Sequence, residues 1–320
     1  MSEMQPAHKP RRWRAAAWGA LGLVGLATLA GFGGRWFWLF EVAGFYRPQL
    51  AGGLLLAAVL PALRKRPLPA VLCLLFALIN ALVLLPLYRS VPPAPPDTPA
   101  LRLLVVNVQE KEDAAVALRR RIAALAPDVV VALEVDYAWA AAMRPLLASH
   151  PYAWVEPRYA GRGIALFSRV PLDGVQVWDV VGADRPALLA EVTVAGQRLT
   201  LVGLHPHPAV NPRDFRLRNA ELARLAAFLA AQPHPVVVAG DLNLAPWGPV
   251  LADFLAAAGL ENGRIGHGLL PTWPTRFPLL RVPLDHVLVS PDLAVRAMHT
   301  PPADGADHLP LLAEIALPAR

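Results

Sequence analysis

The chain has 320 residues, of which 55% are hydrophobic and 17% are charged, and its formal net charge is +6 with a pI of about 10.0. The single cysteine excludes a framework of disulfides within the chain. The positive charge is confined to one end: residues 1–96 hold 10 Lys and Arg against 2 Asp and Glu, whereas the remainder holds 20 against 22. The larger part of the chain therefore lacks the general positive charge expected of a dedicated binder of duplex nucleic acid.

Three uncharged apolar blocks occupy the N-terminal third, at residues 15–34, 48–63 and 67–88. A transmembrane helix needs about 20 predominantly apolar residues, which the first and third blocks supply. The middle block is short, and residues 42–46 on its N-terminal side would lengthen it. We therefore predict three transmembrane helices within a membrane domain of residues 1–89. The alternative for the first block is a cleaved signal peptide, although no clear small-x-small cleavage site precedes a soluble segment.

The basic residues predict how these helices are oriented. Four of them precede the first block within residues 9–14, and Arg64, Lys65 and Arg66 separate the second block from the third. Because positive loops stay in the cytoplasm, three spans place everything after residue 88 on the extracytoplasmic (periplasmic) side of a cell (inner) membrane. The proline-rich residues 90–99 predict a semi-rigid linker to a domain of residues 100–320.

After residue 100 the hydrophobic pattern alternates between strands and helices. Apolar residues at helical spacing predict helices at 114–126, 213–231 and 249–259, and short apolar runs predict strands at 164–168, 175–181, 188–194 and 199–204. This alternation favours an α/β fold.

Polar side chains of the kinds used in catalysis and metal binding lie at the ends of the strand-like runs. They are Asn107 in 101–108, Glu134 after 129–133, His205 after 199–204, Asp285 and His286 in 284–290, and Asp307 and His308 before 309–315. Each alone is compatible with a helix cap or a surface polar group. Jointly they favour a functional site, because rigid scaffolds assemble metal and phosphate sites from single residues delivered by several elements.

The most informative run is residues 236–244, VVVAGDLNL. Its first residues predict a buried strand, and Asp241 and Asn243, two residues apart, point to the same side of an extended chain. The alternative is a strand that ends in an Asx-turn. The other polar strand ends favour a polar site at the mouth of a sheet.

In these motifs the chain resembles the endonuclease/exonuclease/phosphatase superfamily, which includes pancreatic-type deoxyribonucleases, abasic-site endonucleases, neutral sphingomyelinases and inositol polyphosphate 5-phosphatases. The matching segments are LRLLVVNV, VVVALEVD, GIALFSR, LVGLHPHP, VVVAGDLN, TWP, PLDHVLVS and ADHLPLLAEI, and they occur in the family's order over about residues 100–317. One departure is Ala306, where the family usually has Ser. The resemblance implies a four-layer α/β sandwich, with two packed mixed sheets flanked by helices and the site at one end.

The resemblance, together with residue chemistry, assigns a metal-binding role to three residues. Glu134 offers a hard carboxylate of the kind that binds Mg²⁺ or Mn²⁺. Asn107 and Asp307 complete or flank that metal site, as their motif matches imply. The cysteine and histidine residues show no zinc spacing.

Five further residues are expected to act on the phosphate. Asp241 orients or deprotonates the attacking water, and Asn243 holds a phosphate oxygen. His308 contacts phosphate and is kept charged by Asp285, because a neighbouring carboxylate favours the imidazolium. His205 matches a position where some family members have a histidine that contacts phosphate or protonates the leaving group. The weaker candidates are His207, His286, Thr272 and Trp273, and Asp136 and Asp304 are expected to be solvated loop acids.

The substrate is predicted from the layout of the chain. A domain without net positive charge, tethered a short linker from the bilayer, favours a lipid-linked phosphate, pyrophosphate or phosphodiester, because tethering raises the local concentration of headgroups. The layout also resembles bacterial membrane proteins of the superfamily associated with teicoplanin resistance, proposed to act on polyprenyl pyrophosphate. The main alternative is a surface-anchored metal-dependent nuclease with a basic groove drawn from Arg158, Arg162, Arg213 and Arg216. A local basic patch could also form where Arg213, Arg216 and Arg218 lie close together after His205. A non-catalytic scaffold is a third reading, disfavoured because every core catalytic position holds a competent residue.

Overall fold

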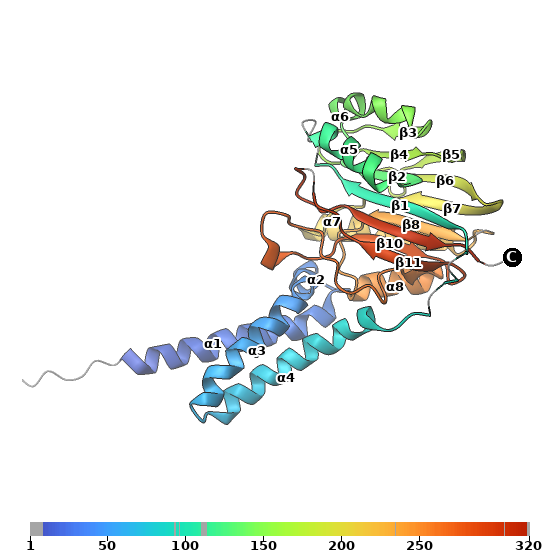
Figure 1. The fold of residues 1–320 in the computed structure, drawn as a ribbon. Coiled ribbons are helices and arrows are strands. Elements are labelled where there is room, and N and C mark those ends of the chain that lie inside the picture. Colours follow the sequence, from blue (N-terminus) through green and yellow to red (C-terminus); the bar gives the residue numbers. More distant parts are fainter. Residues whose placement is uncertain are drawn as a thin grey trace, which may run out of the picture. The chain divides into compact units, whose positions relative to one another are not determined.

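A computed structural model describes residues 9–92, 94–95, 97–109, 114–233, 235–303 and 305–318, with residues 9–12 described in their backbone alone (Figure 1). The chain forms two compact units, and the boundary between them lies between Leu85 and Pro86. The first unit is helical, and the second contains all the strands that the structure describes.

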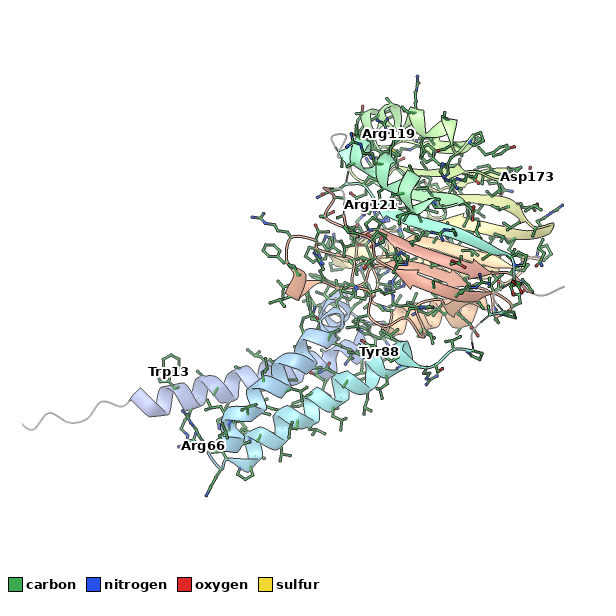
Figure 2. All side chains as sticks on the ribbon, viewed as in Figure 1. Trp13, Arg66, Tyr88, Arg119, Arg121 and Asp173 are labelled. Carbon is green, nitrogen blue, oxygen red and sulfur yellow. The ribbon has the colours of Figure 1, made fainter. Side chains whose placement is uncertain are left out.

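The helical unit consists of four helices joined by short turns. They are α1 (Lys9–Ala30), α2 (Trp38–Phe45), α3 (Arg47–Leu63) and α4 (Pro67–Leu84), with 3-10 turns η1 (Gly31–Gly33) after α1 and η2 (Leu85–Tyr88) after α4. α3 and α4 pack through a small cluster formed by Leu54, Ala58, Cys73 and Ala77. Figure 2 shows Arg66 at the turn that joins these two helices.

A buried polar network joins three helices of this unit. Asn80 on α4 donates from Nδ2 to the Thr28 hydroxyl on α1 at 2.9 Å and accepts from Arg47 Nη1 on α3 at 3.1 Å. The Arg47 guanidinium also lies 4.2 Å from the centroid of the Phe32 ring. Because buried polar groups cost free energy unless they are hydrogen-bonded, these contacts specify how the three helices meet.

The prediction of three transmembrane helices is wrong in number. Two segments are long and apolar enough to cross a membrane, Trp13–Gly33 with 21 residues and Pro67–Tyr88 with 22. The middle helix, α3, has only 17 residues and contains Pro61. Residues 42–46 do not lengthen it, because the backbone leaves helical geometry at Tyr46 and the preceding residues belong to α2.

The second unit contains two six-stranded mixed sheets. One has the strand order β11 (Ala294–His299), β12 (Leu311–Ala316), β1 (Ala100–Asn107), β2 (Val129–Leu133), β4 (Ile164–Ser168) and β3 (Tyr152–Glu156). The other has the order β5 (Leu172–Trp178), β6 (Ala187–Val194), β7 (Gln197–Gly203), β8 (Val236–Asp241), β10 (Asp285–Val289) and β9 (Glu261–Asn262). Each sheet has one parallel pair at its centre, β1 with β2 and β7 with β8, and the other pairs are antiparallel.

Three apolar layers hold the sheets and helices together. Leu103, Val131, Leu201 and other residues from both sheets form one continuous core, so the sheets pack face to face. On the outer face of the second sheet lie α7 (Pro212–Leu229) and α8 (Pro249–Ala258). On the outer face of the first sheet lie α5 (Ala115–Leu125), α6 (Tyr137–Ala142) and the 3-10 turn η4 (Arg144–Ala148). The predicted arrangement of two mixed sheets flanked by helices is confirmed.

Part of the proline-rich segment before β1 is attached to the second unit. Arg296 on β11 donates from Nη2 to the carbonyl oxygens of Pro95 and Thr98, both at 2.9 Å. These two residues are therefore held against the sheet and do not act as a free spacer.

Candidate active site

The pairing of the strands brings the predicted polar residues together. Asn107 is the last residue of β1 and lies opposite Leu133 of β2, so it is next to Glu134. Asp241 is the last residue of β8 and lies opposite Asp285, the first residue of β10. Four of the predicted residues thus lie at the strand ends that open to one edge of the two sheets.

Hydrogen bonds connect the two sheets at this edge. Asn107 donates from Nδ2 to Glu134 Oε1 at 2.9 Å and to Asp241 Oδ2 at 3.3 Å. His205, two residues beyond β7, has its Nε2 3.4 Å from Glu134 Oε1 and its Nδ1 3.1 Å from the Asp241 carbonyl oxygen. Asn107, Glu134, His205 and Asp241 therefore form one continuous polar cluster.

A second cluster shares Asp241. His308 Nδ1 lies 2.8 Å from Asp285 Oδ2, and its Nε2 lies 3.6 Å from Asp241 Oδ2. The Thr272 hydroxyl accepts from the backbone N–H of Asp285 at 3.4 Å, which helps to fix that residue. Asp285 thus orients His308, and the Nε2 of His308 faces Asp241.

Burial and charge set the protonation of these groups. Burial opposes a charge on His308, but the Asp285 and Asp241 carboxylates outweigh it and raise its pKa to about 10. His205 is also buried, yet its contact with Glu134 and the charge of Asp241 raise its pKa above the usual value. Burial raises the pKa of Asp241, which makes this carboxylate a stronger base than an exposed aspartate. Burial would raise the pKa of Asp285 too, but His308 lowers it.

Near the site, the backbone of β8 passes very close to the segment that follows β7. A Cβ atom on Gly240 would lie 1.8 Å from the Leu204 carbonyl oxygen, so only glycine lets β8 pass this close to the segment that carries His205. Glu134 and Asn243 have positive φ angles of 60° and 52°. Such conformations cost free energy in residues other than glycine and gather at functional sites.

Asn243 is held below Asp241. Its backbone N–H donates to Asp241 Oδ1 at 2.9 Å, which is the predicted Asx-type contact, and its side-chain Nδ2 donates to the Pro206 carbonyl oxygen at 3.2 Å. An Asx-turn and a functional role for Asn243 are compatible, because the hydrogen bond of the turn also fixes the Asp241 carboxylate.

The oxygen atoms at this edge fit a hard divalent cation. Glu134 and Asn107 supply a carboxylate and an amide oxygen, which are preferred ligands of Mg²⁺ and Mn²⁺. Asp307 accepts from Trp273 Nε1 at 3.1 Å through Oδ2, while its Oδ1 is buried with no hydrogen-bond partner among the described residues. A buried carboxylate oxygen left without a donor is suited to a metal ion.

Asp241, Asp285 and His308 also lie close enough to hold a metal ion, with candidate ligand atoms within 4.8 Å of one another. The set of Glu134, Asn107 and Asp307 stays a prediction from the resemblance. In the cluster of Asp241, Asp285 and His308, the His308 Nδ1 already contacts Asp285, and an imidazole that binds a metal must be neutral.

The weaker candidates have mostly structural contacts. His286 is buried with Nε2 2.8 Å from the Leu244 carbonyl oxygen, and burial lowers its pKa to about 3. His207 Nδ1 lies 4.0 Å from the buried Glu221 carboxylate. Asp136 is not a solvated loop acid as predicted: it caps α6 by accepting from the Trp139 N–H at 2.7 Å. Asp304 lies outside the described residues.

Two arginines, one half-buried and one fully buried, belong to the site region and were not predicted. Arg185, in the turn before β6, donates to the Gly161 carbonyl oxygen and lies in the field of Glu134 and Asp241, and burial lowers its pKa. Arg264 donates to the backbone carbonyl oxygen of Asp285. In the sequence each is one of 30 basic residues, and no spacing or motif distinguishes it.

The basic groove expected of a nuclease is weakened by ion pairs and burial. Arg158 is paired with Glu156 at 3.2 Å and with Asp184 at 3.1 Å, and Arg162 is paired with Asp184 at 2.9 Å. Arg218 is fully buried and donates to the Asn243 carbonyl oxygen. Of the five arginines considered, only Arg213 and Arg216 are exposed in the part of the chain that the structure describes.

Residues 104–308 match the endonuclease/exonuclease/phosphatase family. The chain belongs to this family. It is therefore a phosphoesterase hydrolase, and the buried Asp and His cluster described above is in keeping with that chemistry. The family prediction made from the motifs is confirmed. No curated protein sequence matches the chain significantly.

Solved structures of the family share the fold of the second unit. TDP2 from D. rerio, in a humanized form with 14 mutations, is 18% identical over 68% of this chain and 98% of its own, with a TM-score of 0.57. Sphingomyelinase C from Streptomyces griseocarneus is 20% identical over 68% of this chain and 99% of its own, with a TM-score of 0.52. The human nocturnin catalytic domain is 20% identical over 68% of this chain and 93% of its own, with a TM-score of 0.54. At these identities the likeness extends to the fold and not to the substrate.

Proposed function

We propose that the protein is a membrane-attached, divalent-metal-dependent phosphoesterase that hydrolyses a lipid-linked phosphate, pyrophosphate or phosphodiester. The observation that carries this proposal is the combination, in one chain, of a buried carboxylate and imidazole site with helices whose outward surface is apolar. Neither feature alone identifies the substrate. Together they favour chemistry on a molecule that resides in the bilayer.

The exposed surface of the helical unit supports membrane attachment. Only 17% of the Trp13–Gly33 window and 28% of the Pro67–Tyr88 window are buried, so neither resembles the core helix of a soluble protein. Leu56 and Leu63 on α3 are 77% and 76% exposed. The first segment also suits a signal sequence, but the second lies far from the N-terminus and has a mean hydropathy of 2.7.

The charges that flank α4 support an extracytoplasmic position for the second unit. Arg64, Lys65 and Arg66 precede this helix, and Arg89 alone follows closely. By the positive-inside rule the start of α4 is cytoplasmic and the chain after it is not. A C-terminal fusion to a reporter that is active only outside the cytoplasm is expected to be active. A reporter active only inside would reverse the assignment.

The residues of the site fit metal-assisted hydrolysis. When bound by Glu134, Asn107 and Asp307, Mg²⁺ or Mn²⁺ would neutralise charge on the phosphate. Asp241, whose pKa is raised by burial, accepts a proton from the attacking water. The charged His308, whose Nδ1 is held by Asp285, donates a hydrogen bond from Nε2 to a phosphate oxygen.

Three further side chains complete the proposed mechanism. Asn243 holds a second phosphate oxygen with its amide. His205, whose pKa is raised by Glu134 and Asp241 against the effect of burial, supplies a proton to the leaving oxygen. Arg185 neutralises charge on the substrate phosphate from the side of Glu134.

A metal-dependent nuclease is the second candidate. A structural relative, TDP2 from D. rerio, has been crystallised with a single-strand DNA product. Of the five arginines considered for a basic groove, Arg213 and Arg216 are exposed and could contact phosphate. This candidate predicts a steep loss of activity as salt rises, because phosphate contacts release counterions.

A panel of substrates separates the two candidates. The full chain in detergent micelles, with Mg²⁺ or Mn²⁺, would be assayed on polyprenyl pyrophosphate, phosphatidic acid, sphingomyelin, a phosphoinositide and plasmid DNA. We expect release from a lipid substrate that disappears with EDTA and in the Asp241→Asn variant. Cleavage of DNA alone would overturn the lipid proposal, and full activity in EDTA would overturn the metal.

A further inference from the structure

The loop between β9 and β10 carries a protruding segment, residues 273–282, which we call the finger. Its base is closed by pairing of Trp273 with Val282, in which the Trp273 N–H donates to the Val282 carbonyl oxygen at 3.0 Å. Arg281 donates from Nη2 to the Thr275 carbonyl oxygen at 2.6 Å and from Nε to the Pro274 carbonyl oxygen at 3.2 Å. The finger is therefore a braced element with its own hydrogen bonds.

The tip of the finger is apolar and faces solvent. Residues 276–280 (RFPLL) are five consecutive exposed residues, and the last four are apolar. Phe277 is 53% exposed, Leu280 is 50% exposed and Leu279 is 88% exposed, the highest value for a large hydrophobic side chain in the described structure. A run of exposed apolar residues is disfavoured in a soluble domain unless it has a binding role.

We propose that the finger inserts its tip into the lipid surface of the membrane. Arg276 and Arg281 flank the tip, and the Arg276 guanidinium lies 5.5 Å from the centroid of the Phe277 ring. Aromatic and aliphatic side chains bordered by arginine suit the boundary between acyl chains and anionic headgroups. This combination of charge and apolar surface favours a bilayer over a protein partner.

The loop that leads into the finger is hydrogen-bonded to the residues just after α4. The Leu87 carbonyl oxygen, three residues after the end of α4, accepts from the N–H groups of Gly266 and Gly268 at 3.0 and 3.1 Å. These glycines belong to the loop that leads into the finger. The end of the candidate span Pro67–Tyr88 is thus hydrogen-bonded to the loop that leads into the finger.

The base of the finger forms one wall of the active site. Trp273 donates from Nε1 to Asp307 Oδ2 at 3.1 Å, and its ring centroid lies 6.4 Å from that of His308. A tip seated in the lipid surface would hold this wall at headgroup level. The inference rests on the proposed lipid substrate and adds how the site reaches that substrate. With the finger inserted, the headgroup phosphate enters the site while the acyl chains of the lipid stay in the bilayer.

A fluorescent probe tests insertion without measuring activity. In a Cys73→Ala background, the full chain would carry Leu279→Cys labelled with an NBD fluorophore and be reconstituted in vesicles of phosphatidylcholine and phosphatidylglycerol. The matched control is Leu147→Cys, an exposed leucine (42%) on η4. We expect blue-shifted emission at position 279 that nitroxide-labelled lipids quench, and neither change at position 147. Emission typical of a probe in water would overturn the inference. A blue shift that the lipid quenchers leave unchanged would also overturn it, and would indicate that protein covers the tip.

An activity measurement separates this inference from the proposed function. The double variant Leu279→Asn and Leu280→Asn is expected to lose about tenfold in turnover of a lipid substrate in vesicles, because the surface contact that concentrates the substrate is lost. Its turnover of the soluble ester bis(p-nitrophenyl) phosphate and that of the Leu147→Asn control should stay unchanged. Insertion of the probe without hydrolysis of any lipid would refute the proposed substrate and leave the finger intact. Lipid hydrolysis that the double variant retains in full would refute the role of the finger.

Discussion

Asp241 is the residue on which both polar clusters depend. It contacts Asn107 and His308 through the same oxygen and Asn243 through the other. Its burial raises the pKa of its carboxyl, so the group can take a proton from water more readily than an exposed aspartate. The chemistry of the site is therefore most sensitive to this position.

Replacing Asp241 by Asn is expected to abolish most of the activity while the fold is kept. The amide has nearly the same shape but cannot accept a proton, so kcat should fall by about 10²- to 10⁴-fold. Single-turnover hydrolysis measures the loss, and an unchanged thermal unfolding midpoint confirms that the protein is folded. A loss of less than threefold would remove Asp241 from its assigned role.

Arg185 is expected to bind the substrate phosphate. Arg185→Gln removes a half-buried positive charge beside Glu134 and should lower kcat/KM by about 10- to 100-fold, since charge-assisted hydrogen bonds to phosphate are strong. Arg198→Gln, at an exposed arginine on β7 paired with Glu191, is the matched control and should behave as wild type. Equal kinetics for the two variants would show that Arg185 only supports the Gly161 turn.

His286 is expected to make the protein sensitive to acid. Its pKa is lowered by burial to about 3, so the folded protein keeps the ring neutral while the unfolded chain protonates it below about pH 6.5. The stability from this group is complete above pH 6.5 and is lost as pH falls toward 3, by about 2 kcal/mol at pH 5. Unfolding in detergent between pH 7 and pH 5 should therefore show a steeper decline for wild type than for His286→Gln. Parallel curves would contradict this reading.

At the residue scale, the motif residues could be predicted because each follows a recognisable strand. Asn107, Glu134 and Asp241 adjoin apolar runs whose pairing brings them together. Arg185 and Arg264 could not be predicted, because their contacts are with backbone carbonyl groups and distant charges that leave no local pattern. The exposed tip at Leu279 could not be predicted either, because the sequence does not show which apolar residues stay outside the core.

At the scale of elements, the approach of β8 to the end of β7 holds the site together. A side chain at Gly240 would meet backbone atoms of Leu204, and backbone cannot move aside as a flexible side chain can. The cost of such a clash exceeds that of ordinary overpacking, which is about 1–3 kcal/mol. The glycine is therefore a structural requirement of the site.

Gly240→Ala is expected to lower the thermal unfolding midpoint strongly or to prevent folding. The control is Gly52→Ala in α3, where a Cβ atom would meet nothing within 4 Å and the helix should gain slight stability. Thermal unfolding of both variants in detergent provides the comparison. If Gly240→Ala is as stable as wild type, the close approach of the two strands is not required.

The elements predicted best were those with uniform burial. The strands at 129–133 and 164–168 were predicted with their observed bounds, and both are buried throughout. β3 and β11 were not predicted, and their residues are mostly half-exposed, unlike those of the uniformly buried strands. β11 also contains a register shift between Val295 and Ala297, which interrupts any period of two.

At the scale of the whole molecule, hydropathy located the apolar blocks but miscounted the spanning helices. The break at Tyr46 depends on backbone geometry, and apolar letters continue across it. Two segments of spanning length remain, Trp13–Gly33 and Pro67–Tyr88. The side of the membrane is consequently argued from the charges around α4 and not from the number of spans.

The net charge of the whole chain says little about the substrate until the charge of each unit is counted separately. The excess of basic residues belongs to the first 96 residues, and in the second unit Arg158 and Arg162 are neutralised by acidic neighbours. The protein is basic as a whole by its pI. The arginines considered for a basic groove in its phosphoesterase unit are nevertheless largely paired or buried in the described structure. This distribution favours a lipid headgroup over a nucleic acid as the substrate.

The most direct test of this account is a competition in one reaction. The full chain in vesicles that contain labelled polyprenyl pyrophosphate, phosphatidic acid and sphingomyelin would be given plasmid DNA and Mg²⁺, and the initial rates of phosphoester cleavage would be compared. We expect one lipid to be hydrolysed at least about tenfold faster than DNA, with no lipid cleavage by Asp241→Asn. DNA cleavage that proceeds while every lipid stays intact would contradict the account.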